Sequence, residues 1–344
     1  MKEKIRKTPE EIKNEILSQL KSGPKTIAEI GENIGSNWLT TEKFLNELKD
    51  EGKISELVSS PKMKIYKRID DLAFYGLPFS EKIRNNTASL LFTIADKYQA
   101  DTKKSPSKTI IQKIAVEFIE KSDGVLKEIP VLKFHYGKTL ALSYDESFKN
   151  EYKLLSLTST QKILLSKLID EYKDMSSHSA QLKQYQGEDM IFYKIKEENF
   201  VKSLLTPDYK NIENSLLKLS IYYPIELENT FELFDRFIYC SVSLLNLSTE
   251  NERKYYLSKI KEIFYLLWDT ITTNYFFFDA EKHIESNKKE LFNQIKINIL
   301  NSKMTNLTSL IDDLESEVNS INPEKISKES SDKSQKFLHE LLED

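Results

Sequence analysis

The chain has 344 residues, of which 39% are hydrophobic and 30% are charged, as is typical of a water-soluble globular protein with two or three domains. The net charge of −4 excludes binding of polyanions by bulk charge alone, and the single cysteine excludes an internal disulfide framework or a CxxC metal site. The N-terminus lacks a signal-peptide core, and the most apolar stretch, 263–278, is too short and interrupted to span a bilayer. We therefore expect a soluble, cytoplasmic protein.

Two short helices are predicted first, over residues 9–21 and 26–34. Thr8 can cap the first helix, and Thr26 with Glu29 has the spacing of a capping box at the start of the second. Gly35 then provides a turn. The apolar residues of each helix lie on one face: Ile12, Ile16, Leu17 and Leu20 in the first, and Ile27, Ile30 and Ile34 in the second.

A third helix is predicted over residues 37–50, capped by Ser36 or Asn37 and ended near Gly52. Its predicted inner stripe consists of Trp38, Thr41, Leu45 and Leu48. Two strand-like runs, 53–60 and 63–69, follow around a Ser-Ser-Pro-Lys turn. Three helices followed by a two-stranded ribbon predict a winged helix-turn-helix, whose protruding third helix fits the major groove of DNA.

The outer side of this third helix carries the side chains that could contact DNA. It bears Leu39, Thr40, Lys43, Asn46 and Glu47; of these, Thr40 and Asn46 can hydrogen-bond base edges, and Lys43 can reach a base or a phosphate. Ser36 and Asn37 can hold a phosphate at the helix N-terminus. The ribbon adds a basic wing that is suited to the DNA backbone or the minor groove: Lys62, Lys64, Lys67 and Arg68.

Charge gives this interpretation modest support. Residues 1–70 hold 14 Lys and Arg against 12 Asp and Glu, a balance of +2, so the remaining residues must carry −6. Acidic side chains near the third helix would repel phosphates if they faced DNA: Glu42, Glu47, Asp50 and Glu51. The wing lysines could also be only a solvated edge that blunts strand pairing.

The segment 26–54, TIAEIGENIGSNWLTTEKFLNELKDEGKI, resembles the winged helix-turn-helix domains common among archaeal transcription regulators. The matching pattern is an AEI…IG second helix, then NW.T, then L..L...G.I, and it covers about the first 70 residues. The resemblance implies DNA binding through the third helix, at Asn37, Trp38, Thr40, Thr41 and Lys43. Thr41 departs from the pattern, because an aliphatic residue usually fills that stripe position. The complete predicted DNA-binding set is Ser36, Asn37, Thr40, Thr41, Lys43, Asn46, Lys62, Lys64, Lys67 and Arg68.

The rest of the chain is predicted to be mainly α-helical. A middle α+β region, 71–145, contains one helix after Ser80, a second capped by Ser105 with Pro106 in its first turn, and a hairpin or extended segment between residues 125 and 144. A helical domain over 146–325 and a polar tail over 326–344 complete the predicted organisation. The aromatic run at 265–278 is interpreted as core.

A sustained heptad pattern marks residues 297–321. Its apolar positions are spaced three and four residues apart: Ile297, Leu300, Met304, Leu307, Ile311, Leu314, Val318 and Ile321. Such a stripe needs a partner helix. The partner could be the same helix of a second chain, giving a homodimer through a coiled coil, or a neighbouring helix of this chain.

No enzyme motif stands out. The sequence GKT at 137–139 lacks the earlier glycine of a phosphate-binding loop, and the four histidines have no partner at metal-ligand spacing. We expect no enzyme activity, no cofactor and no metal, and nothing in the sequence argues for a small-molecule effector. The predicted function is reading of double-stranded DNA as a transcription regulator. The alternative is a scaffold protein whose winged helix binds protein, for example in chromosome organisation or an antitoxin complex.

Overall fold

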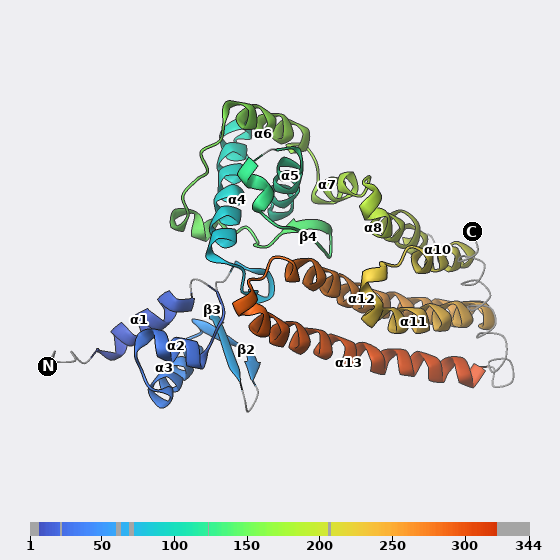
Figure 1. The fold of residues 1–344 in the computed structure, drawn as a ribbon. Helices are drawn as coiled ribbons and strands as arrows, with labels where there is room; N and C mark the ends of the chain where they lie inside the picture. Colours follow the sequence, from blue (N-terminus) through green and yellow to red (C-terminus); the bar gives the residue numbers. More distant parts are fainter. Residues whose placement is uncertain are drawn as a thin grey trace. The chain divides into compact units, whose positions relative to one another are not determined.

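A computed structural model describes residues 7–20, 23–59, 63–68, 72–122, 124–205 and 208–321 (Figure 1). The described residues are mainly helical, as predicted, and their strands form two small antiparallel sheets. No helix among them combines the length and the apolar character needed to span a lipid bilayer.

The described helices and strands fall into three groups along the chain. The elements before residue 69 are α1 (Pro9–Leu20), β1 (Lys25–Thr26), α2 (Ile27–Ile34), α3 (Trp38–Asp50), β2 (Ile54–Ser59) and β3 (Lys64–Arg68). The next are α4 (Glu81–Thr102), α5 (Lys108–Lys121), β4 (Val131–Phe134), β5 (Gly137–Leu140), α6 (Ser159–Tyr172) and α7 (Ser177–Gln184). The last are α8 (Ile191–Ile195), α9 (Lys202–Leu205), α10 (Tyr209–Ile221), α11 (Glu228–Leu247), α12 (Glu250–Glu281) and α13 (Lys289–Ile321).

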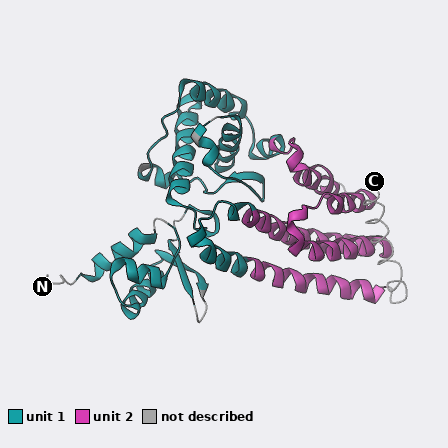
Figure 2. Ribbon diagram, viewed as in Figure 1, with its two compact units in different colours: residues 1–183, 279–299 teal, residues 184–278, 300–344 magenta. Residues whose placement is uncertain are grey.

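The chain divides into two compact units (Figure 2). Unit 1 comprises residues 1–183 and 279–299, and unit 2 comprises residues 184–278 and 300–344. Unit 1 extends past residue 145 to residue 183, because α6 shares a core with α4 and α5. Both α12 and α13 contribute residues to each unit.

Local signals set the ends of the first helices as predicted. Thr26 and Glu29 form the capping box of α2: Glu29 N donates to Thr26 Oγ1 at 3.2 Å, and Thr26 N donates to Glu29 Oε2 at 2.8 Å. Gly35 ends α2 with φ 67°, a left-handed conformation that glycine adopts without a steric penalty. Asn37, rather than Ser36, caps α3.

One core and one sheet unite residues 9–68. The core residues come from α1, α2, α3 and two strands: Ile16, Leu20, Ile27, Ile30, Ile34, Phe44, Leu45, Leu48, Ile54 and Tyr66. The predicted ribbon pairs β2 with β3 antiparallel, with a bulge between Glu56 and Val58. The sequence did not predict β1, which pairs Lys25 with Tyr66 and gives the sheet order β1-β3-β2. The turn residues 60–62 lie outside the described structure.

The middle of unit 1 contains the predicted helices and hairpin. Ser80 caps α4, but α5 is capped by Ser107, whose Oγ accepts from Ile110 N at 3.2 Å. The prediction of Ser105 as cap and Pro106 in the first turn is therefore wrong: the helix starts two residues later, because a second serine with the same capping chemistry stands there.

Two α5 side chains hold the β4–β5 hairpin. Gln112 accepts from Leu140 N at 3.0 Å and donates to Leu142 O at 2.6 Å. The buried Lys113 ammonium donates to Tyr136 O at 2.5 Å and to Lys138 O at 2.9 Å. The hairpin is thereby fixed to the helix through backbone groups that its own two strands do not pair.

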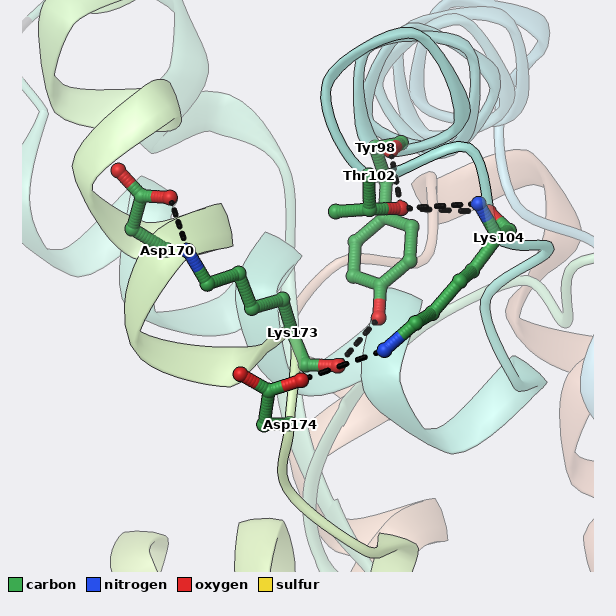
Figure 3. Close-up of polar contacts among 6 residues, drawn as sticks. All are labelled: Tyr98, Thr102, Lys104, Asp170, Lys173 and Asp174. Atoms are coloured by element: carbon green, nitrogen blue, oxygen red, sulfur yellow. Dashed lines mark hydrogen bonds and ion pairs between the residues drawn. The ribbon is translucent and has the colours of Figure 1, made fainter.

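The C-terminal ends of α4 and α6 are joined by polar contacts (Figure 3). Tyr98 OH donates to Lys173 O at 3.2 Å, and Lys104 Nζ lies 3.3 Å from Asp174 Oδ1. Thr102 Oγ1 donates to Tyr98 O at 2.8 Å and accepts from Lys104 N at 3.2 Å. These contacts close the last turn of α4 where no glycine is present.

Aromatic side chains dominate the core of unit 2, which confirms the interpretation of the run at 265–278 except for the exposed Tyr265 and Leu266. Trp268 stacks on Phe192 with ring centroids 5.2 Å apart, and the rings of Phe200 and Phe264 lie 4.1 Å apart. Phe276 and Phe277 are fully buried. Large rings on neighbouring helices bury much area, so they hold the short α8–α10 segments against α11 and α12.

The predicted heptad seam is largely buried within the chain. Five of its positions are buried, and Met304 and Ile321 are half-buried; the five are Leu300, Leu307, Ile311, Leu314 and Val318. Arg236 of α11 bonds Glu315 at 2.7 Å and Asp312 at 2.6 Å, and Lys259 of α12 bonds Glu317 at 2.9 Å. The partners of this seam are therefore α11 and α12, and Ile297 is the seam position with an exposed side chain, at 51%.

Candidate nucleic-acid interface

The helix α3 has one buried and one exposed side. Its buried residues are Thr41, Phe44, Leu45 and Leu48. Trp38, predicted in this stripe, is 47% exposed at the edge of the helix, and Phe44 occupies the core instead. The exposed side chains Leu39, Lys43 and Asn46 follow one another at spacings of four and three residues, so they form a single line opposite the core.

Thr41 belongs to the core and not to the DNA-binding set. It has no exposed surface, and its Oγ1 donates to Asn37 O at 2.9 Å. A Cβ added at Gly31 of α2 would lie 3.2 Å from Thr41 Oγ1. A small side chain opposite a glycine lets α2 and α3 approach closely, which explains why a threonine stands where an aliphatic residue was expected.

The free backbone N–H groups at the N-terminus of α3 are partly hydrogen-bonded by the helix's own cap residue. Asn37 Oδ1 accepts from Thr40 N at 2.9 Å, so its amide NH₂ is the part of this side chain that remains for a ligand. By position, the N–H groups of Trp38 and Leu39 have no acceptor within the helix. Asn37 is exposed, and Ser36 and Thr40 are half-buried.

Three of the four carboxylates that would repel phosphates have basic partners, and the fourth, Asp50, is exposed. Glu42 bonds Lys64 at 2.7 Å, Glu47 bonds Lys13 at 2.8 Å, and Glu51 bonds Lys13 and Lys53, each at 2.7 Å. Hydrogen bonds from Lys13 and Lys53 lower the pKa of Glu51 to about 2. The negative charge of Glu42, Glu47 and Glu51 is therefore balanced by lysines, of which Lys13 comes from α1.

The basic side chains of the wing are more paired and more buried than the sequence suggested. Lys64 pairs with Glu42, which raises the pKa of this lysine. Lys67 and Arg68 are half-buried, and the stem of Lys67 lies so close to Gly76 that a Cβ there would come within 2.7 Å of Lys67 Cδ. Lys62 lies outside the described residues.

Among the described residues of the predicted set, Lys43 is the exposed cation. Its side chain is 69% exposed, and its nearest carboxylate oxygen, on Glu47, is 3.9 Å away. Comparison with protein-family models, with curated proteins and with solved structures gave no match. The candidate interface is therefore argued from its geometry, with Lys43 and Asn46 as its central polar groups.

Sequence reasoning missed Lys13, because Glu47 and Glu51 are more than 30 positions away from it and no local pattern joins them. The residues GKT at 137–139 lie in strand β5, where they pair with β4 and form no phosphate-binding loop. Among the described residues, no three His, Cys, Asp or Glu side chains are placed to hold a metal ion.

Proposed function

We propose that residues 9–68 form a winged helix-turn-helix domain that binds duplex DNA and that the protein acts as a transcription regulator. The observation that carries the proposal is the exposed line of α3: Lys43 and Asn46 face solvent while the opposite side of the helix packs on α1 and α2. Asn46 has the donor and acceptor to bond an adenine edge, and Lys43 can bond a guanine edge or a phosphate.

Two further features support this proposal. Strand β2 contacts α3 and pairs with β3, so the ribbon lies beside α3, as a wing does. The pairing of Glu42 and Glu47 with lysines removes much of the repulsion that the acidic composition of this region implies. Approach to a polyanion then depends on the few cations that stay exposed.

A salt titration with a charge-reversal variant tests the proposal. The full chain is titrated into a fluorescent duplex of about 30 base pairs of random sequence between about 50 and 200 mM salt. We expect binding that weakens with salt, and Lys43→Glu should weaken it at least about tenfold at low salt and lower the salt slope by about one. Lys167→Glu, the same charge change on an exposed position of α6, is the control.

Binding that does not respond to salt, or an equal loss in Lys43→Glu and Lys167→Glu, would contradict the proposal. Because the side chain of Lys43 is 69% exposed, its replacement leaves the fold intact, and thermal unfolding of the variant checks this.

A second candidate function is protein binding through the same helix. It is favoured by the exposed apolar side chains of Trp38 and Leu39. Under this alternative, duplex DNA does not bind, and Leu39→Ala abolishes a protein complex instead.

A further inference from the structure

Leu39 is a large apolar side chain in the first turn of α3, at the N-terminal end of its exposed line. It is 77% exposed, and it stands four residues before Lys43 and seven before Asn46 on the outer line of α3. At about 1.5 Å of rise per residue, the line from Leu39 to Asn46 is about 10 Å long, which corresponds to about three base-pair steps of DNA.

Packing gives no reason for a leucine at this position. The core side of α3 is complete with Thr41, Phe44, Leu45 and Leu48, and Leu39 points away from all of them. Burial of its apolar surface would lower the free energy, but only a partner molecule or a segment outside the described part of the chain could cover it. Beside it are Lys43 and the cap of α3, which favour an anionic partner with apolar groups.

We propose that Leu39 reads the C5-methyl groups of thymine, so that the protein prefers A·T-containing duplexes read from the major groove. This inference rests on the proposed function. The thymine methyl is the apolar group that the major groove offers, and apolar side chains contact it. Asn46, on the same line, can bond adenine bidentately, so both side chains favour A·T pairs, at positions about three steps apart.

The test removes only the methyl groups. Two fluorescent duplexes of equal length are compared, one of alternating dA and dT and the other with dU in place of every dT. The wild-type chain should bind the dU duplex about fourfold more weakly for each methyl group that Leu39 would otherwise cover. Leu39→Ala should bind the dT duplex correspondingly more weakly and should no longer distinguish the two.

A matched control is Ile163→Ala. Ile163 is 73% exposed on α6, so this change removes a similar exposed side chain away from α3, and discrimination should persist. A second probe pair, alternating dG–dC with and without 5-methylcytosine, adds the methyl at the same groove position. It should strengthen binding by the wild type but not by Leu39→Ala.

The outcomes separate the inference from the proposed function. Salt-sensitive binding that Lys43→Glu weakens, with equal affinity for the dT and dU duplexes, overturns the inference and leaves the function. Failure to bind any duplex overturns both. If Leu39→Ala lowers the molar mass in solution while methyl discrimination is absent, Leu39 covers a second copy of the chain, and the inference is overturned.

Discussion

Residues 9–68 and the chain from residue 72 onward differ in how far apart in sequence their contacting side chains are. In the N-terminal region, helix ends are fixed by residues three positions apart, such as Thr26 with Glu29 and Asn37 with Thr40. In the later helices, the polar contacts join distant positions, such as Tyr172 with Glu117 and Arg236 with Glu315, which are 55 and 79 residues apart. Caps three residues apart set helix ends in both regions, Ser80 and Ser107 among them, but the polar side-chain contacts between elements within the first region span up to 38 residues, as in Lys13 with Glu51.

This difference predicts that the two regions unfold separately. Leu45→Ala leaves a cavity in the N-terminal core and should lower the free energy of unfolding of that region by about 3 kcal/mol. The chain has two tryptophans, Trp38 in α3 and Trp268 in unit 2. Urea unfolding of Leu45→Ala, followed in Trp268→Phe and Trp38→Phe backgrounds, should show the loss in the Trp38 signal alone.

The matched variant Ile311→Ala, in the buried seam of α13, should affect the Trp268 signal instead. If either variant shifted the unfolding transitions of both tryptophan signals equally, the two regions would form one cooperative unit and would not unfold separately.

The second prediction concerns a long-range contact, Lys113 beneath the β4–β5 hairpin. Burial lowers the pKa of this ammonium to about 7, whereas an unfolded lysine has a pKa of about 10.4. Between these values the unfolded chain binds a proton that the folded chain does not, so the free energy of unfolding should rise with pH, by about 2 kcal/mol from about pH 7 to pH 9.

Urea unfolding followed by circular dichroism at several pH values across this window measures the slope. Lys113→Met should lack the rise, and Lys82→Met, at a well-exposed lysine, should keep it. The same slope in wild type and Lys113→Met would show that another group titrates.

The smallest effect is expected at a local signal. Gly35 has φ 67° and open space around the position of a Cβ, so Gly35→Ala should cost about 1 kcal/mol through backbone strain alone. Gly35→Asn should cost less, because asparagine tolerates the left-handed conformation. Thermal unfolding read from Trp38 measures both; equal losses in the two variants would point to a cause other than backbone conformation.

The sequence predicted those elements whose signals lie within a few residues. The capping box of α2, the turn at Gly35, the end of α3 before Gly52 and the hairpin at residues 131–140 were found in this way. The strand β1 was missed because two residues carry no periodicity, and only pairing with Tyr66 and Ile65 makes them a strand.

The candidate interface was predictable in part for the same reason. Helical spacing placed Leu39, Lys43 and Asn46 on the outer side of α3, as the structure has them. It could not place Trp38 outside the core or reveal that Lys64 is engaged with Glu42, because both depend on neighbours distant in sequence. Charge counting likewise treated every lysine of the wing as equally available.

Two contacts with late residues set an order of events during synthesis. At the bulge of β2, Leu57 O accepts from Asn298 Nδ2 at 3.0 Å, and Glu29 bonds Lys288 at 2.6 Å, although these pairs are 241 and 259 residues apart. A ribosome completes every residue of the N-terminal core long before it reaches α13. The nascent chain therefore carries that domain with the Leu57 carbonyl and the Glu29 carboxylate still hydrated, and the domain acquires its final surface only when the last described helix is made.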